Sequence, residues 1–502
     1  MYGNTRIRVD WRASAELMGV VLIYFAVPLS FPLLLAVYFE EPLTPFLVAI
    51  GVTLALGAGL RRLGDPEENL GPREAFLAVA LIWLLVAVVG AVPFVVAGAG
   101  TIAHPVNALF ESMSGLTTTG ATVLVDFSVH DRSIMMWRQL IQWLGGLGIL
   151  ILATAVLSEL GVGGAQLMES ETRTRNVNKL TPHIAETARL IWGLYVGLTL
   201  LAAVVFFVLG LAFDPRMGPY NALAHAFTSV ATAGFSPEPL SAGAFHPVLQ
   251  WAIVPFMILG STSFILLYVF INGEPRRLLR NEEFRFYVGG LGIFAALVAL
   301  VLFVTGEQGG AIEPTIRHAV FNVTSIVTTT GYASTDFNLW SPAATYLLFL
   351  AMFTGGMVGS TTCSIKSLRW LVALKSLRRE LFTSVHPEAV RPVRVSGSPV
   401  AEDTIRDVYA YLLLGIVIFV GLAVFVAVDA ARVGMDLSAF EAMGAAASTF
   451  LNIGPAFGEA GPYGTYAAFP MSTRSVMIVL MWVGRIEMIP VLVLFTRTFW
   501  TS

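Results

Sequence analysis

The sequence has 502 residues, of which 56% are hydrophobic and 13% are charged, and its formal net charge is −3. An average soluble protein carries about twice this charged fraction, so the composition excludes an ordinary soluble globular protein. The single cysteine, Cys363, excludes an internal disulfide and a thiolate metal cluster.

Ten apolar stretches are predicted to cross a membrane as helices, so the chain reads as an all-α polytopic membrane protein. The stretches cover residues 15–39, 43–62, 76–98, 133–160, 186–213, 245–272, 284–305, 342–378, 403–428 and 472–498. The first two form an N-terminal extension within residues 1–75. The other eight pair into four units with a short loop between the two spans of each, at residues 76–165, 166–275, 276–380 and 381–502.

The loops between paired spans contain four versions of one short segment that ends on a glycine. They are FESMSGLTTTG at 110–120, AHAFTSVATAG at 224–234, FNVTSIVTTTG at 321–331 and GAAASTFLNIG at 444–454. The first and third agree at six of eleven positions, and all four carry a polar residue two places before the glycine. The repetition predicts four walls of one pore in a pseudo-fourfold arrangement. Close packing of membrane helices through small residues is the alternative.

Basic residues are unevenly divided between the two sides of this topology. Most lie near the N-terminus and in the segments 61–73, 173–189, 276–285 and 369–406. Because lysine and arginine are enriched on the cytoplasmic side of membrane proteins, the pattern places both termini inside and the four glycine-ending segments outside.

Each glycine-ending segment is too short to cross a bilayer, so we expect it to enter from outside and turn back. Its short helix would point the negative end of the helix dipole at the membrane centre. The extended backbone that follows would present carbonyl oxygens to a dehydrated cation, and the uncharged turns favour a monovalent ion. Glu111, near the outer mouth, either concentrates cations or is a capping group.

Two polar features interrupt the later spans. The eighth span contains GGMVGSTTCS at 355–364, followed by Lys366, and these residues make poor helix at membrane depth. They indicate a break that lines a cavity, although a kinked packing helix also fits. The tenth span contains Arg485, whose insertion costs about 2.5–3.5 kcal/mol, so it should face water or protein. Glu487 lies on a different helix face, which makes it an imperfect partner for a structural ion pair.

These motifs resemble those of the Trk/Ktr superfamily of potassium transport proteins, most closely the TrkH-type membrane subunit. The resemblance covers nearly the whole chain. It includes the four glycine-ending segments, the divergent LNIGPAFGE at 451–459, the segment that begins QWLGGLGILIL at 142–172, and the N-terminal helix pair, which fits TrkH rather than the shorter Ktr subunit.

The resemblance implies that potassium is bound by Thr118, Thr119, Gly120, Thr232, Ala233, Gly234, Thr329, Thr330, Gly331, Asn452, Ile453 and Gly454. Ile453 would have to act through its carbonyl. The resemblance also implies an intramembrane gate beneath this filter, formed by Gly355, Gly356, Gly359, Ser360, Thr361, Thr362 and Lys366, with Arg485 as a barrier to cations. The family pattern has further glycines where Cys363 and Ser364 stand here.

The function implied by the resemblance is channel-like potassium uptake across the cytoplasmic membrane, driven by the membrane potential. K⁺ is then the transported ion, with no organic cofactor in this chain. The implied partners are a second copy of the chain in a homodimer, a cytosolic TrkA-type nucleotide-binding subunit and the lipid bilayer, and no nucleic acid. The basic loops 273–285 and 379–402 either dock that subunit or are ordinary cytoplasmic loops.

Three other functions remain open from the sequence. The first is Na⁺-dependent potassium symport of the Ktr type, and the second is secondary transport of another small solute, which would need repeats of opposite orientation. The third is a membrane-embedded hydrolase or scaffold. The sequence contains no phosphate-binding loop with lysine, no nucleophile–base pair and no redox motif, so we expect no enzymatic activity.

Overall fold

The computed structural model of the protein describes residues 9–64, 71–155 and 184–501. Expectations that fall on residues 1–8, 65–70, 156–183 and 502 lie outside this part of the chain. They include the end of the motif at 142–172 and five of the basic residues expected on the cytoplasmic side, which are Arg6, Arg8, Arg173, Arg175 and Lys179.

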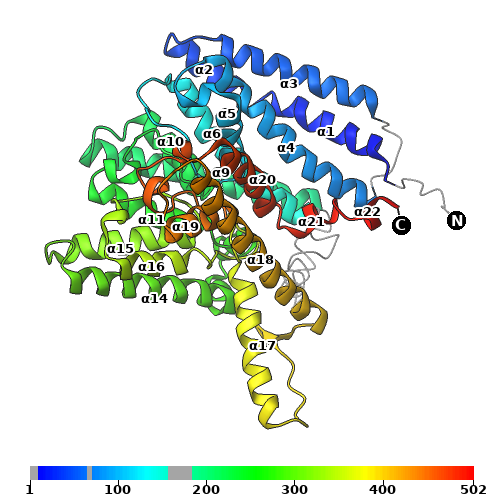
Figure 1. Cartoon of the computed structure of the whole chain (residues 1–502), viewed down its shortest axis with the longest axis vertical. Coiled ribbons are helices and arrows are strands. Elements are labelled where there is room, and N and C mark those ends of the chain that lie inside the picture. Colours follow the sequence, from blue (N-terminus) through cyan, green and yellow to red (C-terminus); the bar gives the residue numbers. More distant parts are fainter. Residues whose placement is uncertain (1–8, 65–70, 156–183, 502) are drawn as a thin grey trace.

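The N-terminal extension consists of α1 (Trp11–Phe25), α2 (Ser30–Tyr38) and α3 (Thr44–Leu63). Small residues bring α1 and α3 together, because a Cβ atom at Gly19 would lie within 3.0 Å of the carbonyl oxygen of Gly57. Both helices also contact α4 (Pro72–Ala97), and the three lie side by side along one edge of the molecule (Figure 1).

Four short helices, which we call the pore helices, lie inside the body: α5 (Pro105–Leu116), α10 (Pro219–Val230), α15 (Ile312–Val327) and α19 (Ala439–Phe450). The second half of each is buried. Other helices pack around them: α6 (Arg132–Ala155), α9 (Ile184–Phe213), α11 (Pro247–Gly260), α12 (Phe264–Ile271), α14 (Glu282–Thr305), α16 (Pro342–Ala351), α17 (Ser367–Val385), α18 (Glu402–Arg432) and α20 (Met471–Arg485). The outer faces are apolar; Leu200, Leu201 and Val204 on α9, for example, are exposed.

Local sequence explains where several of these helices begin. Proline occupies the first turn of α5, α10, α11 and α16, where its fixed φ suits the helix and its missing N–H is not needed. The last pore helix begins instead with a capping box, in which Ser438 and Glu441 bond each other's backbone N–H groups.

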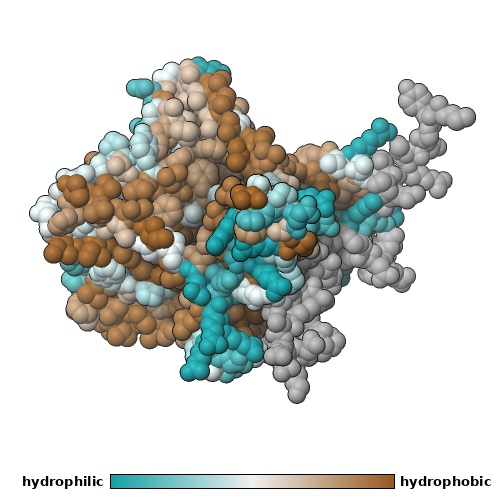
Figure 2. Space-filling view, turned by 90° about the horizontal axis from the view of Figure 1, so that it is seen from below, coloured by the Kyte–Doolittle hydropathy of each residue, from teal (hydrophilic) through white to brown (hydrophobic). Residues whose placement is uncertain are grey.

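The remaining elements are short. Besides 3-10 turns of three or four residues, they include the helices α13 (Pro275–Arg280), α21 (Ile489–Val493) and α22 (Arg497–Thr501), and the antiparallel strands β1 (Arg394–Val395) and β2 (Ser398–Pro399). Val393, Val395 and Val400 of this hairpin pack against α17 and α18. Figure 1 shows α17 projecting away from the rest of the molecule. Seen from that side, hydrophobic surface borders a central hydrophilic patch (Figure 2).

Six described helical segments are long and apolar enough to cross a membrane: Trp11–Tyr38, Thr44–Leu63, Arg73–Ala97, Ala188–Phe213, Glu282–Thr305 and Glu402–Arg432. They correspond to six of the ten predicted spans. A seventh, at 133–160, begins as the helix α6 and runs beyond the described residues. The structure is therefore a mostly helical membrane protein.

The other three predicted spans are not continuous helices. The span predicted at 245–272 bends by 105° between α11 and α12. The span at 342–378 is helical only up to Ala351 and again from Ser367, and the span at 472–498 breaks after Arg485. The first break lies at Ser261–Ser263, where the chain bonds another non-helical segment, so uninterrupted apolarity did not predict it.

Candidate ion-conduction site

The four pore helices end in the same way. In each, the backbone N–H of the residue just before the final glycine donates to a carbonyl oxygen five residues earlier, in the last turn of the helix. The bonds run from Thr119 to Ser114 (2.8 Å), Ala233 to Thr228 (2.9 Å), Thr330 to Ser325 (2.8 Å) and Ile453 to Ser448 (2.9 Å). This is the six-to-one bond of a Schellman motif, which requires a left-handed residue directly before the donor.

That left-handed residue is threonine or asparagine in all four copies. The φ angles are +53° at Thr118, +50° at Thr232, +52° at Thr329 and +55° at Asn452. A β-branched residue at positive φ is an outlier that persists only where the surrounding structure holds it, and such strain gathers at functional sites. We call the residues that follow each pore helix turn 1 (Thr118–Gly120), turn 2 (Thr232–Gly234), turn 3 (Thr329–Gly331) and turn 4 (Asn452–Gly454).

The four turns lie side by side in a closed ring. A Cβ atom on the glycine of each turn would come within 3.0 Å of the carbonyl oxygen just before the glycine of the next turn. The pairs are Gly120 with Ala233, Gly234 with Thr330, Gly331 with Ile453, and Gly454 with Thr119. The order follows the chain and returns to its start. All four glycines also have positive φ, so backbone conformation and close approach both require glycine.

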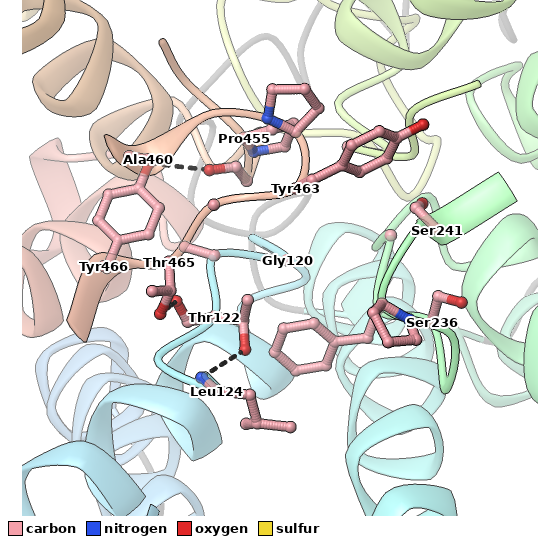
Figure 3. Close-up of a pocket in the computed structure, with 18 of the residues that line it drawn as sticks. Gly120, Thr122, Leu124, Ser236, Ser241, Pro455, Ala460, Tyr463, Thr465 and Tyr466 are labelled. Carbon is pink, nitrogen blue, oxygen red and sulfur yellow. Dashed lines mark hydrogen bonds between the residues drawn. The ribbon is translucent and has the colours of Figure 1, made fainter. Parts of the chain in front are cut away.

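A cavity of about 280 Å³ opens onto this ring and is lined by all four glycines. We call it the outer cavity, because the sequence predicts that this side of the ring faces outward. Figure 3 shows Gly120, Ser236, Tyr463 and Tyr466 around it. The pore helices end at the ring, so the negative ends of their dipoles point toward it. The arrangement therefore gathers backbone oxygens and partial negative charge, with no charged side chain in the turns themselves.

The other side of the ring contacts residues 352–366, which connect α16 to α17 and which we call the intramembrane segment. The hydroxyl of Thr361 lies 2.8 Å from that of Thr232 in turn 2. The backbone N–H of Cys363 donates to the hydroxyl of Thr329 in turn 3 at 3.1 Å. Two neighbouring turns are thus tied to the segment through their left-handed residues.

The intramembrane segment is held by the break between α11 and α12. The N–H groups of Met357 and Thr361 donate to the carbonyls of Ser261 (3.0 Å) and Gly260 (3.2 Å), and Gly359 accepts from Phe264 at 3.0 Å. Two non-helical stretches at membrane depth therefore satisfy each other's backbone groups. A kinked packing helix at 355–364 does not describe this geometry.

The remaining predicted gate residues make contacts within the segment and with the break between α11 and α12. The N–H of Gly355 donates to Ile365 at 2.8 Å, and a Cβ atom at Gly356 would lie within 3.0 Å of the Ser261 carbonyl oxygen. Ser360 and Thr362 share a hydroxyl contact of 2.7 Å. The buried ammonium of Lys366 donates to the carbonyl of Thr362.

Arg485 links the intramembrane segment to α6. Its guanidinium donates to the carbonyl of Thr361 (2.8 Å), to Sγ of Cys363 (2.8 Å) and to the carbonyl of Gly145 (3.0 Å). The side chain is 1% exposed, and no carboxylate bonds it within the described part of the chain. Glu487 pairs with Arg369 of α17 at 2.5 Å instead, so a structural ion pair between Arg485 and Glu487 is excluded.

Sequence reasoning missed several buried side chains that fix the ring. Arg138 on α6 pairs with Glu111 at 2.7 Å, and Glu111 also accepts from the N–H of Val123 just after turn 1. Glu111 is fully buried, so it is a bracing group rather than an exposed cation trap. Gln142, also on α6, bonds turn 2, and the hydroxyl of Tyr466 donates to the Gly454 carbonyl at 2.8 Å. Polar residues in apolar helices were the available signal.

The described residues contain no group of three or more histidine, cysteine, aspartate or glutamate side chains able to hold a metal ion. The oxygens that the four turns bring together are backbone carbonyls and hydroxyls, and such oxygens suit alkali cations.

Comparison with known proteins identifies relatives along almost the whole chain. The family model of the TrkH cation transport proteins matches residues 44–501. The Trk system potassium uptake protein TrkH of Halomonas elongata is 35% identical, with 97% of this chain and 99% of the relative covered. The Escherichia coli K12 protein of the same name is 33% identical, over 98% of this chain and all of the relative.

A solved structure agrees with the sequence comparisons. The crystal structure of the potassium transporter TrkH from Vibrio parahaemolyticus superposes with a TM-score of 0.86 and 31% identity, covering 98% of this chain and 100% of that chain. These relatives are transport proteins and not enzymes. The chain belongs to the TrkH family of cation transport proteins.

Proposed function

We propose that this protein takes up potassium across the cytoplasmic membrane through the ring of four turns. The observation that carries the proposal is the closed contact of each glycine with the carbonyl of the next turn. Four strips of backbone around one axis can replace the hydration shell of a dehydrated alkali cation. The names of its relatives, which are potassium uptake proteins, support K⁺ as the ion.

The ion contacts in this proposal are the three residues of each turn. Oxygens of Thr118, Thr119 and Gly120 and of the equivalent residues in turns 2 to 4 would surround the ion, with Ala233 and Ile453 acting through their carbonyls. The four helix dipoles lower the energy of a cation at this place. The membrane potential, worth about 2.3 kcal/mol per 100 mV for each charge, would drive entry without a coupled ion.

The intramembrane segment and Arg485 form the gate in this proposal. The segment bonds turns 2 and 3 on the side of the ring opposite the outer cavity. The positive charge of Arg485 lies beside it, where it would repel a cation leaving the ring. Opening would require the segment to leave Thr232 and Thr329, and the guanidinium to leave Thr361.

The wider arrangement is ten spans, of which the last eight form four repeats around one pore. The turns would face outward and both termini inward, as the basic residues indicate. The protein would act as a homodimer together with a cytosolic TrkA-type nucleotide-binding subunit. In the proposed orientation, the projecting helix α17 and the hairpin that follows it would offer that subunit a cytoplasmic contact surface. The relatives are named as members of a system, which supports a further component.

Cation flux into liposomes tests the proposal. Purified protein should carry K⁺ and Rb⁺ inward with a negative interior, in the absence of Na⁺, and a nucleotide-binding partner should change the rate. A strict requirement for external Na⁺ would favour a Ktr-like symporter. Absence of K⁺ flux, with or without Na⁺ and the partner, would contradict the proposal and favour transport of another solute.

A further inference from the structure

The four turns are braced in two different ways. Turns 1 and 3 are braced by their own threonines. The hydroxyls of Thr117 and Thr119 lie 2.7 Å apart, and those of Thr328 and Thr330 also lie 2.7 Å apart. These hydroxyl bridges join the end of the pore helix to the residue before the glycine. Turns 1 and 3 are opposite each other in the ring, so the self-braced turns alternate with the other two.

Turn 2 has no such bridge, because alanine occupies both equivalent positions, 231 and 233. The side chain of Gln142, which comes from α6, takes its place. Its Nε2 donates to the carbonyl of Ala233 at 2.6 Å, and its Oε1 accepts from the N–H of Phe235 at 3.0 Å. The carboxamide therefore bonds the backbone on both sides of Gly234. The two partners fix its orientation, since a carbonyl only accepts and an N–H only donates.

The equivalent positions in two other units are apolar. A glycine on α6, α11 and α20 approaches the last carbonyl of a pore helix: Gly145 faces Leu116, Gly260 faces Val230 and Gly484 faces Phe450. Three residues before these glycines stand Gln142, Met257 and Met481, and all three are fully buried. Methionine thus fills the position equivalent to Gln142 on α11 and α20. A buried apolar side chain can pack at this position, so packing alone does not explain the glutamine on α6.

Among the four ring glycines, Gly234 in turn 2 lies closest to the next turn. A Cβ atom at Gly234 would lie only 1.9 Å from the carbonyl oxygen of Thr330. A small rotation of the Ala233 carbonyl would change the spacing of oxygens on two adjacent turns. Selectivity among alkali cations depends on the number and spacing of such oxygens.

We propose that Gln142 is a positioning residue that sets the K⁺/Na⁺ selectivity of the ring by holding the Ala233 carbonyl. This inference rests on the proposed function. Turn 4 is braced within its own unit, since the hydroxyls of Ser448 (2.6 Å) and Tyr466 (2.8 Å) both donate to the Gly454 carbonyl. The brace of turn 2 differs, because Gln142 comes from a helix of the first unit and bonds the backbone of the second unit.

The test compares Gln142→Met with the parent and with Met257→Leu, a matched change at the equivalent buried position of α11. K⁺ and Na⁺ fluxes are measured separately in liposomes, together with the melting temperature of each protein. Gln142→Met should lower the K⁺/Na⁺ flux ratio about fivefold, the equivalent of one lost hydrogen bond, while Na⁺ flux rises. Met257→Leu should keep the parental ratio.

Gln142→Glu provides a second, isosteric variant. Its ionised form retains an acceptor for Phe235 but has no donor for Ala233, so the ratio should fall at a pH at which the carboxyl is ionised. An unchanged ratio in both variants, an equal fall in Met257→Leu, or failure of both Gln142 variants to fold would overturn the inference. Absence of K⁺ flux in the parent protein would instead overturn the proposed function, so the two failures are distinguishable.

Discussion

Gly234 has the least room of the four ring glycines. A Cβ atom there would overlap the Thr330 carbonyl oxygen, and its φ of +81° is unfavourable for alanine by about 1–2 kcal/mol. Gly421 lies within the helix α18, and apart from its two chain neighbours and the backbone of its own helix, no atom lies within 4 Å of the place that a Cβ atom would take there.

We therefore expect Gly234→Ala to reduce K⁺ flux in liposomes by at least about tenfold, the kinetic equivalent of 1.4 kcal/mol, and to lower the K⁺/Na⁺ ratio. Gly421→Ala is the control and should keep the parental flux. Equal, near-parental selectivity in the two variants would mean that the close contact between turns 2 and 3 plays no part in conduction.

Arg485 allows a second prediction at this scale. Its guanidinium bonds three backbone or sulfur acceptors and no described carboxylate, so its charge is not neutralised locally. Arg485→Ala should raise the K⁺ flux by about tenfold, because a positive charge next to the path is removed. Arg474→Ala, near the outer side, serves as the control. Reduced or unchanged flux in well-folded Arg485→Ala protein would count against the barrier role.

Site residues that recur in every repeat could be predicted from the sequence, whereas contacts between distant residues could not. The final glycine and the polar residue before it recur in every copy, so the turns could be located from the sequence. Gln142 and Ala233 are 91 positions apart, and their contact depends on how two units meet. Glu111 was visible, but only the fold places Arg138 beside it.

At the scale of elements, α17 is connected to the break in the last span. The guanidinium of Arg369 on α17 bonds Glu487 at 2.5 Å and lies 3.8 Å from the ring centre of Tyr411 on α18. Glu487 and Met488 both have positive φ, at +64° and +46°, directly after the helix that carries Arg485. Glu487 forms a partly buried ion pair with α17, so movement of α17 can reach the two strained residues and, through them, Arg485.

Breaking this ion pair should therefore change both stability and basal flux. We expect Arg369→Met and Glu487→Gln each to lower the melting temperature and raise basal K⁺ flux. The double variant should be non-additive, with an interaction free energy of about 0.5–3 kcal/mol. Arg406→Met removes the exposed pair with Asp403 and should have little effect. Additive single effects would show that α17 and the break are not coupled.

Apolarity predicted one of the two facing helix breaks poorly. The break at 355–364 was predicted because glycines and hydroxyls gather there. The break between α11 and α12 was missed, although Gly260-Ser261-Thr262-Ser263 repeats the type of residues in Gly359-Ser360-Thr361-Thr362. Long apolar residues on both sides masked it. Each break satisfies the other's backbone, so neither is explained by its own sequence alone.

For the whole molecule, the proposed pore depends on four separated stretches of chain meeting around one axis. The closed order of contacts between turns 1, 2, 3 and 4 is a property of the folded chain, and the repeats in the sequence were its only local sign. The outer cavity, the ring and the intramembrane segment then lie in succession, which is the order that an inward-moving ion would meet.

Anomalous diffraction from crystals soaked in Rb⁺ or Tl⁺ would show whether an ion binds at the ring. These ions substitute for K⁺ and can be located without reference to any proposed ligand. We predict a peak on the axis of the ring, surrounded by oxygens of Thr119, Ala233, Thr330 and Ile453 or of the neighbouring turn residues. A ring without bound ion, together with ordered peaks elsewhere in the membrane region, would contradict the account.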